Sequence, residues 1–246
     1  MTFDLEIFWD ALTSQEFLDG ALITVALAVS AMATAIVFGL VVAVARGSEV
    51  AAVRWAAATY TWFFRAVPTL LQILFVWNAL PQLFPALKED WFTPFLAGYI
   101  ALALNEAAYM AEITRSGMLS IDPGQRLAAR ALGMRSWPTL RRIIIPQTIR
   151  VAIPPAANEF ITLLKLTSLA SVISLQELLT VTGQQVSLTF RFAELYAAAT
   201  VYYLVIVSAL MILQSRLERR YAWSSRERSG SILSRSRPRL RASEVR

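Results

Sequence analysis

The chain has 246 residues, of which 57% are hydrophobic and only 16% are charged, and its mean hydropathy is +0.53. Because a soluble domain carries roughly a quarter charged residues, this composition indicates a membrane protein. The sequence contains no cysteine and no histidine, which excludes disulfides, thiol catalysis, histidine acid–base chemistry and Cys/His zinc sites. The formal net charge is +6, but its distribution along the chain argues against a nucleic-acid partner.

Residues 1–20 are predicted to form an extracytoplasmic N-terminal segment. They contain five acidic residues and no basic one. Because a signal peptide begins with basic residues, this segment is not expected to be one. The apolar residues Phe3, Ile7, Phe8 and Leu12 predict a short helix that lies on the membrane surface.

Five hydrophobic stretches follow, and they predict an all-α, polytopic membrane protein with five transmembrane helices. The first, Ala21 to Ala45, has 25 residues without a charge, enough to cross roughly 30 Å of hydrocarbon. The others are expected near residues 56–80, 95–117, 151–175 and 195–215. We therefore expect one transmembrane domain over residues 21–217, and a basic tail over 218–246 whose composition is typical of disorder.

The basic residues predict how these helices are oriented. Twenty of the 23 Lys and Arg residues lie in three segments, 46–65, 115–150 and 216–246, which the five spans place on one side. Because cytoplasmic loops carry the excess of basic residues, we expect the N-terminus outside and the C-terminus in the cytoplasm. The basic tail can also contact anionic membrane lipid.

Charged residues inside the predicted spans are candidates for a functional site. A charge at the bilayer centre costs about 2.5–3.5 kcal/mol, so it usually faces a protein interior or a wet cavity. Glu106 has no partner within a helical turn, whereas Glu112 precedes Arg115 by three residues and can form an interfacial ion pair. Arg65, near the cytoplasmic end of the second span, either extends to the headgroups or has a functional role.

The 151–175 span carries a polar face. At 100° per residue, four polar residues fall on an arc of about 120°; they are Asn158, Glu159, Thr162 and Lys165. Pro154 and Pro155 precede them and can free backbone groups, as in the midplane sites of transport proteins. The alternative is a structural polar seam between two helices.

Residues 121–150 form the only long polar, basic segment between hydrophobic stretches, and their pattern predicts two short helices. Asp122 and Pro123 are expected to begin the first helix and Gly133 to end it. Ser136 is expected to cap the second helix. The simplest alternative is a solvated basic loop, but a pair of capped helices indicates a docking surface on the cytoplasmic side.

The stretch GQRLAARALGMRSWPTLRRIIIPQ resembles the cytoplasmic EAA loop of importer-type ABC transporter permeases. Ala128, Ala129, Gly133 and Pro146 match that signature. The stretches FFRAVPTLLQ (63–72), NEAAYMAEITRSG (105–117) and NEFITLLKLTSLASVISLQEL (158–178) look like the polar amino-acid uptake group. The similarity covers about residues 20–217.

This resemblance implies a five-helix permease core that pairs with a second permease subunit, with two cytoplasmic ATPases and with an extracytoplasmic binding protein. In the family the EAA loop, here about residues 118–150, docks on the ATPase. The coupling residues that this implies are Leu127, Ala128, Ala129, Arg130, Gly133 and Pro146. Leu127 stands where the motif has Glu, which suggests that a partner permease with that Glu shares the coupling in a heterodimer. Leu166 stands where the group often has a polar or acidic residue.

The expected function is that of a permease subunit, not an enzyme, in an ATP-driven importer of the bacterial inner membrane. Its cargo would be a polar amino acid or close derivative, with a slight preference for cationic ones because three Glu and one Lys lie within the spans. The expected cavity residues are Glu106, Asn158, Glu159, Thr162 and Lys165. No G-x-x-x-x-G-K-[ST] loop occurs, so ATP and Mg²⁺ are expected on a separate chain, with no cofactor or metal on this one. The alternatives are a passive channel or ion-coupled carrier, and a non-transporting membrane scaffold.

Overall fold

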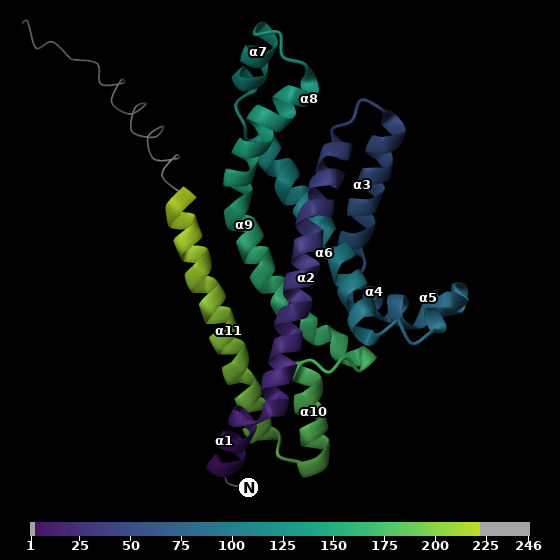
Figure 1. Cartoon of the computed structure of the whole chain (residues 1–246), viewed down its shortest axis with the longest axis vertical. Coiled ribbons are helices and arrows are strands. Elements are labelled where there is room, and N and C mark those ends of the chain that lie inside the picture. The colour runs from purple at the N-terminus through teal and green to yellow at the C-terminus, as the bar shows by residue number, and fades with distance from the viewer. Residues whose placement is uncertain (1–2, 222–246) are drawn as a thin grey trace, which may run out of the picture.

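The computed structural model describes residues 3–221, and within them every regular element is helical (Figure 1). The molecule is elongated, with α7 and α8 at one end and α1 and α10 at the other. The long helices are α2 (Gln15–Arg46), α6 (Pro94–Leu119), α9 (Ile145–Leu166) and α11 (Phe192–Tyr221). The shorter elements are α1 (Leu5–Thr13), α3 (Ala51–Ala66), α4 (Thr69–Leu74), η1 (Phe75–Ala79), α5 (Leu80–Leu83), η2 (Pro85–Lys88), α7 (Pro123–Ala131), α8 (Ser136–Thr139), η3 (Leu140–Ile144), η4 (Thr167–Ile173) and α10 (Leu178–Thr189).

Small residues hold α2 and α6 together at the centre of the molecule. Ala31, Ala35, Ala101 and Ala107 are fully or almost fully buried in the main hydrophobic core. Small side chains let two helix backbones approach closely, which is how helices pack in a membrane without a hydrophobic force between them. The α2–α6 pair is therefore the axis on which the other helices pack.

Three helical segments are long and apolar enough to cross a membrane: Gln15–Arg46, Ser136–Ile173 and Phe192–Arg219. A fourth span results if α3 and the helix that follows it count as one bent span. α6 has 26 residues and matches the predicted third span, but it carries Glu106 at its middle and Glu112 and Arg115 in its second half. The prediction of an all-helical membrane protein is confirmed, whereas the number of five spans and the orientation of the termini stay predictions.

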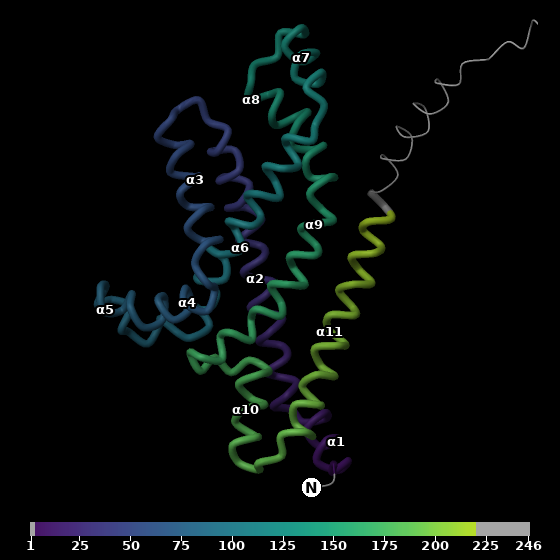
Figure 2. The backbone as a smooth tube through the Cα atoms, turned by 180° about the vertical axis from the view of Figure 1, so that it is seen from behind, coloured from purple at the N-terminus to yellow at the C-terminus, as the bar shows by residue number. Residues whose placement is uncertain are grey.

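The helix of the second predicted span is divided in two by a bend. α3 ends at Ala66, and the chain bends by 104° before it continues from Thr69 (Figure 2). The cause is Pro68, which has no N–H and forces the preceding residue out of the helical region; Val67 is extended, with φ −85° and ψ 132°. The segment from α4 to α5 therefore extends sideways from the helical body.

The end that carries α1 contains more helix than its sequence suggested. Asp4 caps α1 and Ser14 caps α2 with their side chains. Residues 176–194, between the fourth and fifth predicted spans, contain the 12-residue helix α10 (Leu178–Thr189). α11 continues to Tyr221, four residues past the expected domain boundary, and the remainder of the predicted tail lies outside the described residues.

Candidate functional site

The bend between α3 and α4 leaves backbone carbonyls without helical partners, and two side-chain amides bind them. Gln72 Nε2 donates to the carbonyl oxygens of Phe64, at 2.9 Å, and Val67, at 2.8 Å. Asn105 Nδ2 of α6 also donates to the Phe64 oxygen, at 2.9 Å. A buried carbonyl without a donor costs free energy, so these amides fix the bend against the middle of α6.

Glu106 follows Asn105 and lies in the interior of the molecule. Only 1% of its surface is exposed, and neither carboxylate oxygen has a hydrogen-bond partner in the part of the chain that the structure describes. Buried polar groups are normally paired, so an unpaired buried carboxyl group is a candidate for contact with a ligand or a partner.

The polar face of α9 lies on an accessible side of this helix. Asn158 and Lys165 are exposed, whereas Glu159 and Thr162 are half-buried. The charge of Glu159 acts on Glu106, so these two predicted residues are linked electrostatically. The Thr162 hydroxyl donates to the Asn158 carbonyl within the helix, at 3.3 Å. α9 continues through Pro154 and Pro155 without a break, and their missing N–H groups leave carbonyls of the preceding turn without helical donors.

A charged cluster lies further along α6, where Glu112 pairs with three arginines from three helices. Glu112 accepts hydrogen bonds from Arg46 of α2 and from Arg115 Nε, the latter at 3.1 Å. Arg65 Nη1 of α3 is 3.8 Å from Glu112 Oε1. The expected pair with Arg115 is confirmed; Arg46 and Arg65 come from other helices, and helical spacing along the sequence could not identify them.

Arg65 also faces the candidate site. Its guanidinium carbon lies 5.5 Å from the centre of the Tyr109 ring, a cation–π distance, and its charge acts on Glu159 of α9. Arg65 therefore belongs to the Glu112 cluster and also acts through its charge on the polar face of α9.

The predicted pair of short helices forms the end of the molecule opposite α1 (Figure 1). Asp122 caps α7 by accepting from the backbone N–H of Gly124 at 2.7 Å. Gly133 has φ +74°, and the N–H groups of Gly133 and Met134 bond to the carbonyls of Arg130 and Ala129. These two hydrogen bonds form a Schellman motif, which needs a residue in the left-handed region and so favours glycine.

The start of the second short helix differs from the prediction by one residue. Arg135 is the N-cap residue of α8, and Ser136 is the first residue of the helix. No side chain caps this helix. The predicted coupling residues lie in different environments: Leu127 is 65% exposed, Ala129 is buried, and Ala128 and Arg130 are exposed. Pro146 is in the first turn of α9, where its missing N–H costs least.

Known proteins share both the sequence and the fold. The family model of the binding-protein-dependent transport system inner membrane component matches residues 11–223. The probable amino-acid permease protein YxeN of Bacillus subtilis is 39% identical over 197 residues, which are 80% of this chain and 87% of that protein. The glutamine transport system permease protein GlnP of Escherichia coli K12 is 37% identical over 221 residues, 89% of this chain and 98% of that protein.

Among solved structures, a crystal structure of an amino acid ABC transporter with histidines is 34% identical. It superposes with a TM-score of 0.79 and covers 89% of this chain and 100% of its own. An inward-facing structure of the methionine ABC transporter MetNI has a TM-score of 0.72 at 17% identity over 89% of this chain and 99% of its own, which shows the shared fold alone. The chain therefore belongs to the binding-protein-dependent transport system inner membrane components, as a multi-pass amino-acid permease of the ABC transporter class in the bacterial inner membrane.

Proposed function

We propose that this permease translocates a polar amino acid or close derivative into the cell, with a slight preference for cationic ones. The energy comes from ATP, which is bound with Mg²⁺ on a separate chain. The observation that carries this proposal is a direct mechanical connection. α8, η3, α9 and η4 form one helical segment of 38 residues, Ser136–Ile173, which begins in the hairpin of α7 and α8 and carries Glu159. A movement of the hairpin would therefore reach the candidate site along one continuous helical segment.

The hairpin of α7 and α8 is suited to dock on a partner ATPase. Its turn is fixed by the Schellman motif at Gly133, and Leu127 and Leu132 present large apolar side chains at its surface, 65% and 81% exposed. Exposed apolar side chains on a rigid helical projection are typical of a protein interface. Ala128, Ala129, Arg130 and Pro146 lie in or beside this hairpin, which supports their proposed role in coupling.

The solute would bind beside Glu106 and the polar face of α9. Glu106 and Glu159 would receive an ammonium group, whereas Asn158, Thr162 and Lys165 would bind other polar groups of the solute. Leu166 is half-buried and packs against the main core, so it narrows the polar face without adding a contact of its own.

The partners would be two ATPase subunits, an extracytoplasmic amino-acid-binding protein and a second permease. Leu127 cannot supply the charged contact that the EAA motif normally makes, which favours a heterodimer in which the other permease has the Glu. Purification of the tagged chain from its native membrane in mild detergent tests this. A P-loop ATPase and a second EAA-type permease should copurify. Recovery without a nucleotide-binding partner, also after gentle crosslinking, would contradict the importer function, and a fully coupled homodimer would contradict the heterodimer.

Glu159 offers the sharpest test of the solute site. Glu159→Ala should abolish uptake in proteoliposomes that contain the whole transporter, because an ammonium group would lose its half-buried counter-charge. Assembly should be unchanged, since Glu159 makes no hydrogen bond or ion pair within residues 3–221. Glu218→Ala on α11 is the matched control, and uptake at the wild-type rate by Glu159→Ala would rule out this role.

A further inference from the structure

Arg65 has unused hydrogen-bond donors at the edge of the candidate site. A guanidinium group carries five N–H donors and no acceptor. In the described part of the chain none of them makes a hydrogen bond, and Glu112 Oε1 lies 3.8 Å from Arg65 Nη1. Glu112 already accepts from Arg46 and Arg115, so its carboxylate does not need a third arginine.

The cluster around Glu112 therefore has an excess of positive charge. Three arginines surround one carboxylate, and Arg65 is the most exposed of them, with 46% of its side chain accessible against 22% for Arg46 and 38% for Arg115. The contact with the Tyr109 ring restrains the Arg65 guanidinium without using its in-plane N–H groups. Such a group is prepared to bind a carboxylate through two parallel hydrogen bonds.

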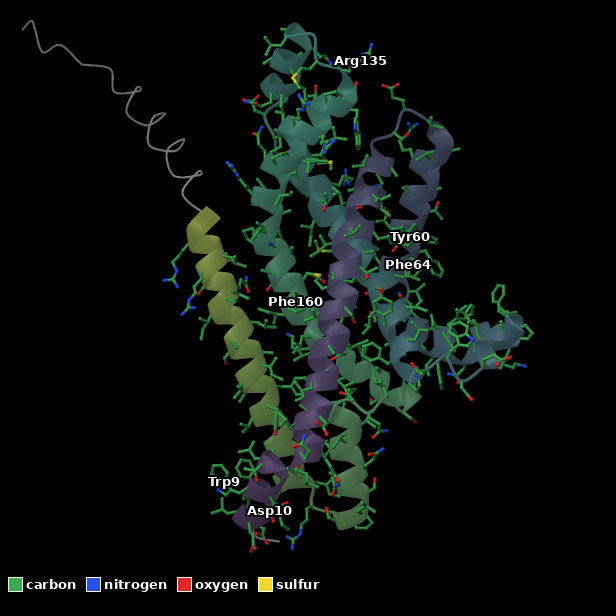
Figure 3. The ribbon with its side chains drawn as sticks, in the orientation of Figure 1. Trp9, Asp10, Tyr60, Phe64, Arg135 and Phe160 are labelled. Carbon is green, nitrogen blue, oxygen red and sulfur yellow. The ribbon has the colours of Figure 1, made fainter. Side chains whose placement is uncertain are left out.

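The position of Arg65 in α3 argues against a role in headgroup binding. An arginine that extends to the headgroups is expected at the helix end closest to the membrane surface. Arg65 is instead in the last turn of α3, at the end next to the bend, and the helix is about 24 Å long at 1.5 Å per residue. Its neighbour Phe64 lies near the middle of the long axis of the molecule (Figure 3).

Groups of opposite charge face Arg65. The Tyr109 ring that Arg65 contacts lies three residues, one helical turn, after Glu106 on α6. Neither carboxylate oxygen of Glu106 has a hydrogen-bond partner within residues 3–221, and the Arg65 charge also acts on Glu159 of α9. A positive group with free donors thus lies within a helical turn of a buried carboxylate with free acceptors on α6, and its charge reaches a second carboxylate on α9. A simple amine would satisfy only the negative side, whereas the zwitterionic end of an α-amino acid satisfies both.

We propose that Arg65 binds the α-carboxylate of the transported amino acid, opposite Glu106 and Glu159, which receive its ammonium group. The proposal rests on the proposed function, and it makes Arg65 the residue that distinguishes amino acids from the corresponding amines. The carboxylate donates nothing and accepts two N–H groups of the guanidinium, so no proton moves.

Direct binding to the purified permease–ATPase complex, without the binding protein, tests the role of Arg65. The standard L-amino acids and octopine are first screened by thermal shift. The strongest binder is then titrated calorimetrically beside its decarboxylated amine, for example L-arginine beside agmatine. The wild-type complex should bind the amino acid more tightly. Arg65→Gln should weaken amino-acid binding roughly ten- to a hundredfold and leave amine binding unchanged, which removes the preference.

Two further variants separate recognition from structure. Arg115→Gln removes the same charge from the same cluster but should keep the preference, because Arg115 bonds Glu112 directly. Arg65→Lys keeps the charge but not the two-donor geometry, so it should retain only part of the preference for the amino acid over the amine. If Arg65→Gln fails to copurify with the ATPase, Arg65→Lys is the variant that is measured.

The possible results distinguish the two proposals. If the wild-type complex prefers an amino acid and both Arg65 variants keep that preference in full, the role of Arg65 is wrong and the proposed function stands. Equal loss of amino acid and amine binding in the Arg65 variants would also overturn the role, because it indicates structural damage. If the wild-type complex binds none of the screened compounds, both proposals fail.

Discussion

Glu177 is a fully buried carboxyl group that caps α10, outside the membrane-spanning helices. It accepts from the backbone N–H groups of Leu179, at 2.9 Å, and Thr180, at 2.7 Å. Burial raises the pKa of Glu177 above its ordinary value of 4.5, although these hydrogen bonds oppose the shift. The folded protein therefore holds this proton more tightly than the unfolded chain does.

This shift predicts how Glu177 affects stability across pH. Because its pKa is raised in the folded state, its stabilising contribution is complete below about 4.5 and is lost as pH rises through the raised pKa. The Tm of the purified permease, compared between wild type and Glu177→Gln, should show this loss only in the wild type. Glu6→Gln, at an exposed position of α1, is the control. Parallel Tm–pH curves for wild type and Glu177→Gln would contradict the expected contribution.

Single residues also show what the sequence can and cannot say about the site. The pair of Glu112 and Arg115 is predictable because a three-residue spacing on a helix brings side chains together. Arg46 and Arg65 reach the same carboxylate from α2 and α3, and Asn105 reaches the carbonyl of Phe64 across 41 residues. Such contacts depend on how the helices pack, which a local pattern does not encode.

At the scale of elements, the contact between α2 and α6 is set by Gly39. A Cβ atom at this position would lie 2.7 Å from Met110 Cβ and 2.9 Å from the Ala107 carbonyl oxygen, closer than real Cβ contacts. Part of that contact is backbone, which cannot move aside as a flexible side chain can. The two helices must therefore separate if Gly39 gains a side chain.

Gly39→Ala should consequently lower the stability of the permease by about 1–3 kcal/mol, as overpacking does in other cores, and Gly39→Val should lower it further. Gly183→Ala is a matched control in α10, because a Cβ there meets nothing within 4 Å. Alanine has a helix propensity better than glycine by about 1 kcal/mol, so the control should be neutral or stabilising. Thermal unfolding in detergent measures both, and equal Tm values for Gly39→Ala and wild type would show that the helices tolerate the separation.

The elements differ in how well their sequences specified them. The ends of α7 were predictable because Asp122, Pro123 and Gly133 each satisfy a local backbone requirement. The 104° bend after α3 was not, although a proline stands at position 68. A proline predicts an interruption, but the direction in which the chain continues depends on Gln72 and Asn105, which bind the freed carbonyls.

For the whole molecule, the described helices place two groups of residues at opposite ends. Trp9 and Asp10 lie at one end and Arg135 at the other (Figure 3). The acidic residues of α1 and the basic hairpin of α7 and α8 thus lie at opposite ends of the long axis of the molecule. By the positive-inside rule, this separation predicts that the hairpin and the loop between α2 and α3 lie on the cytoplasmic side.

The predicted orientation can be tested directly because the chain contains no cysteine. Single cysteines at Asp10, Glu49 and Arg135, all exposed, would report on the two sides without removal of native thiols. A membrane-impermeant maleimide should label Asp10→Cys in spheroplasts, and Glu49→Cys and Arg135→Cys only in inverted vesicles. Glu49 is needed because a docked ATPase can shield Arg135, whereas the α2–α3 loop lies on a separate projection. Labelling of Glu49→Cys in spheroplasts, with Asp10→Cys protected, would reverse the orientation and move the hairpin to the side where no ATPase is available.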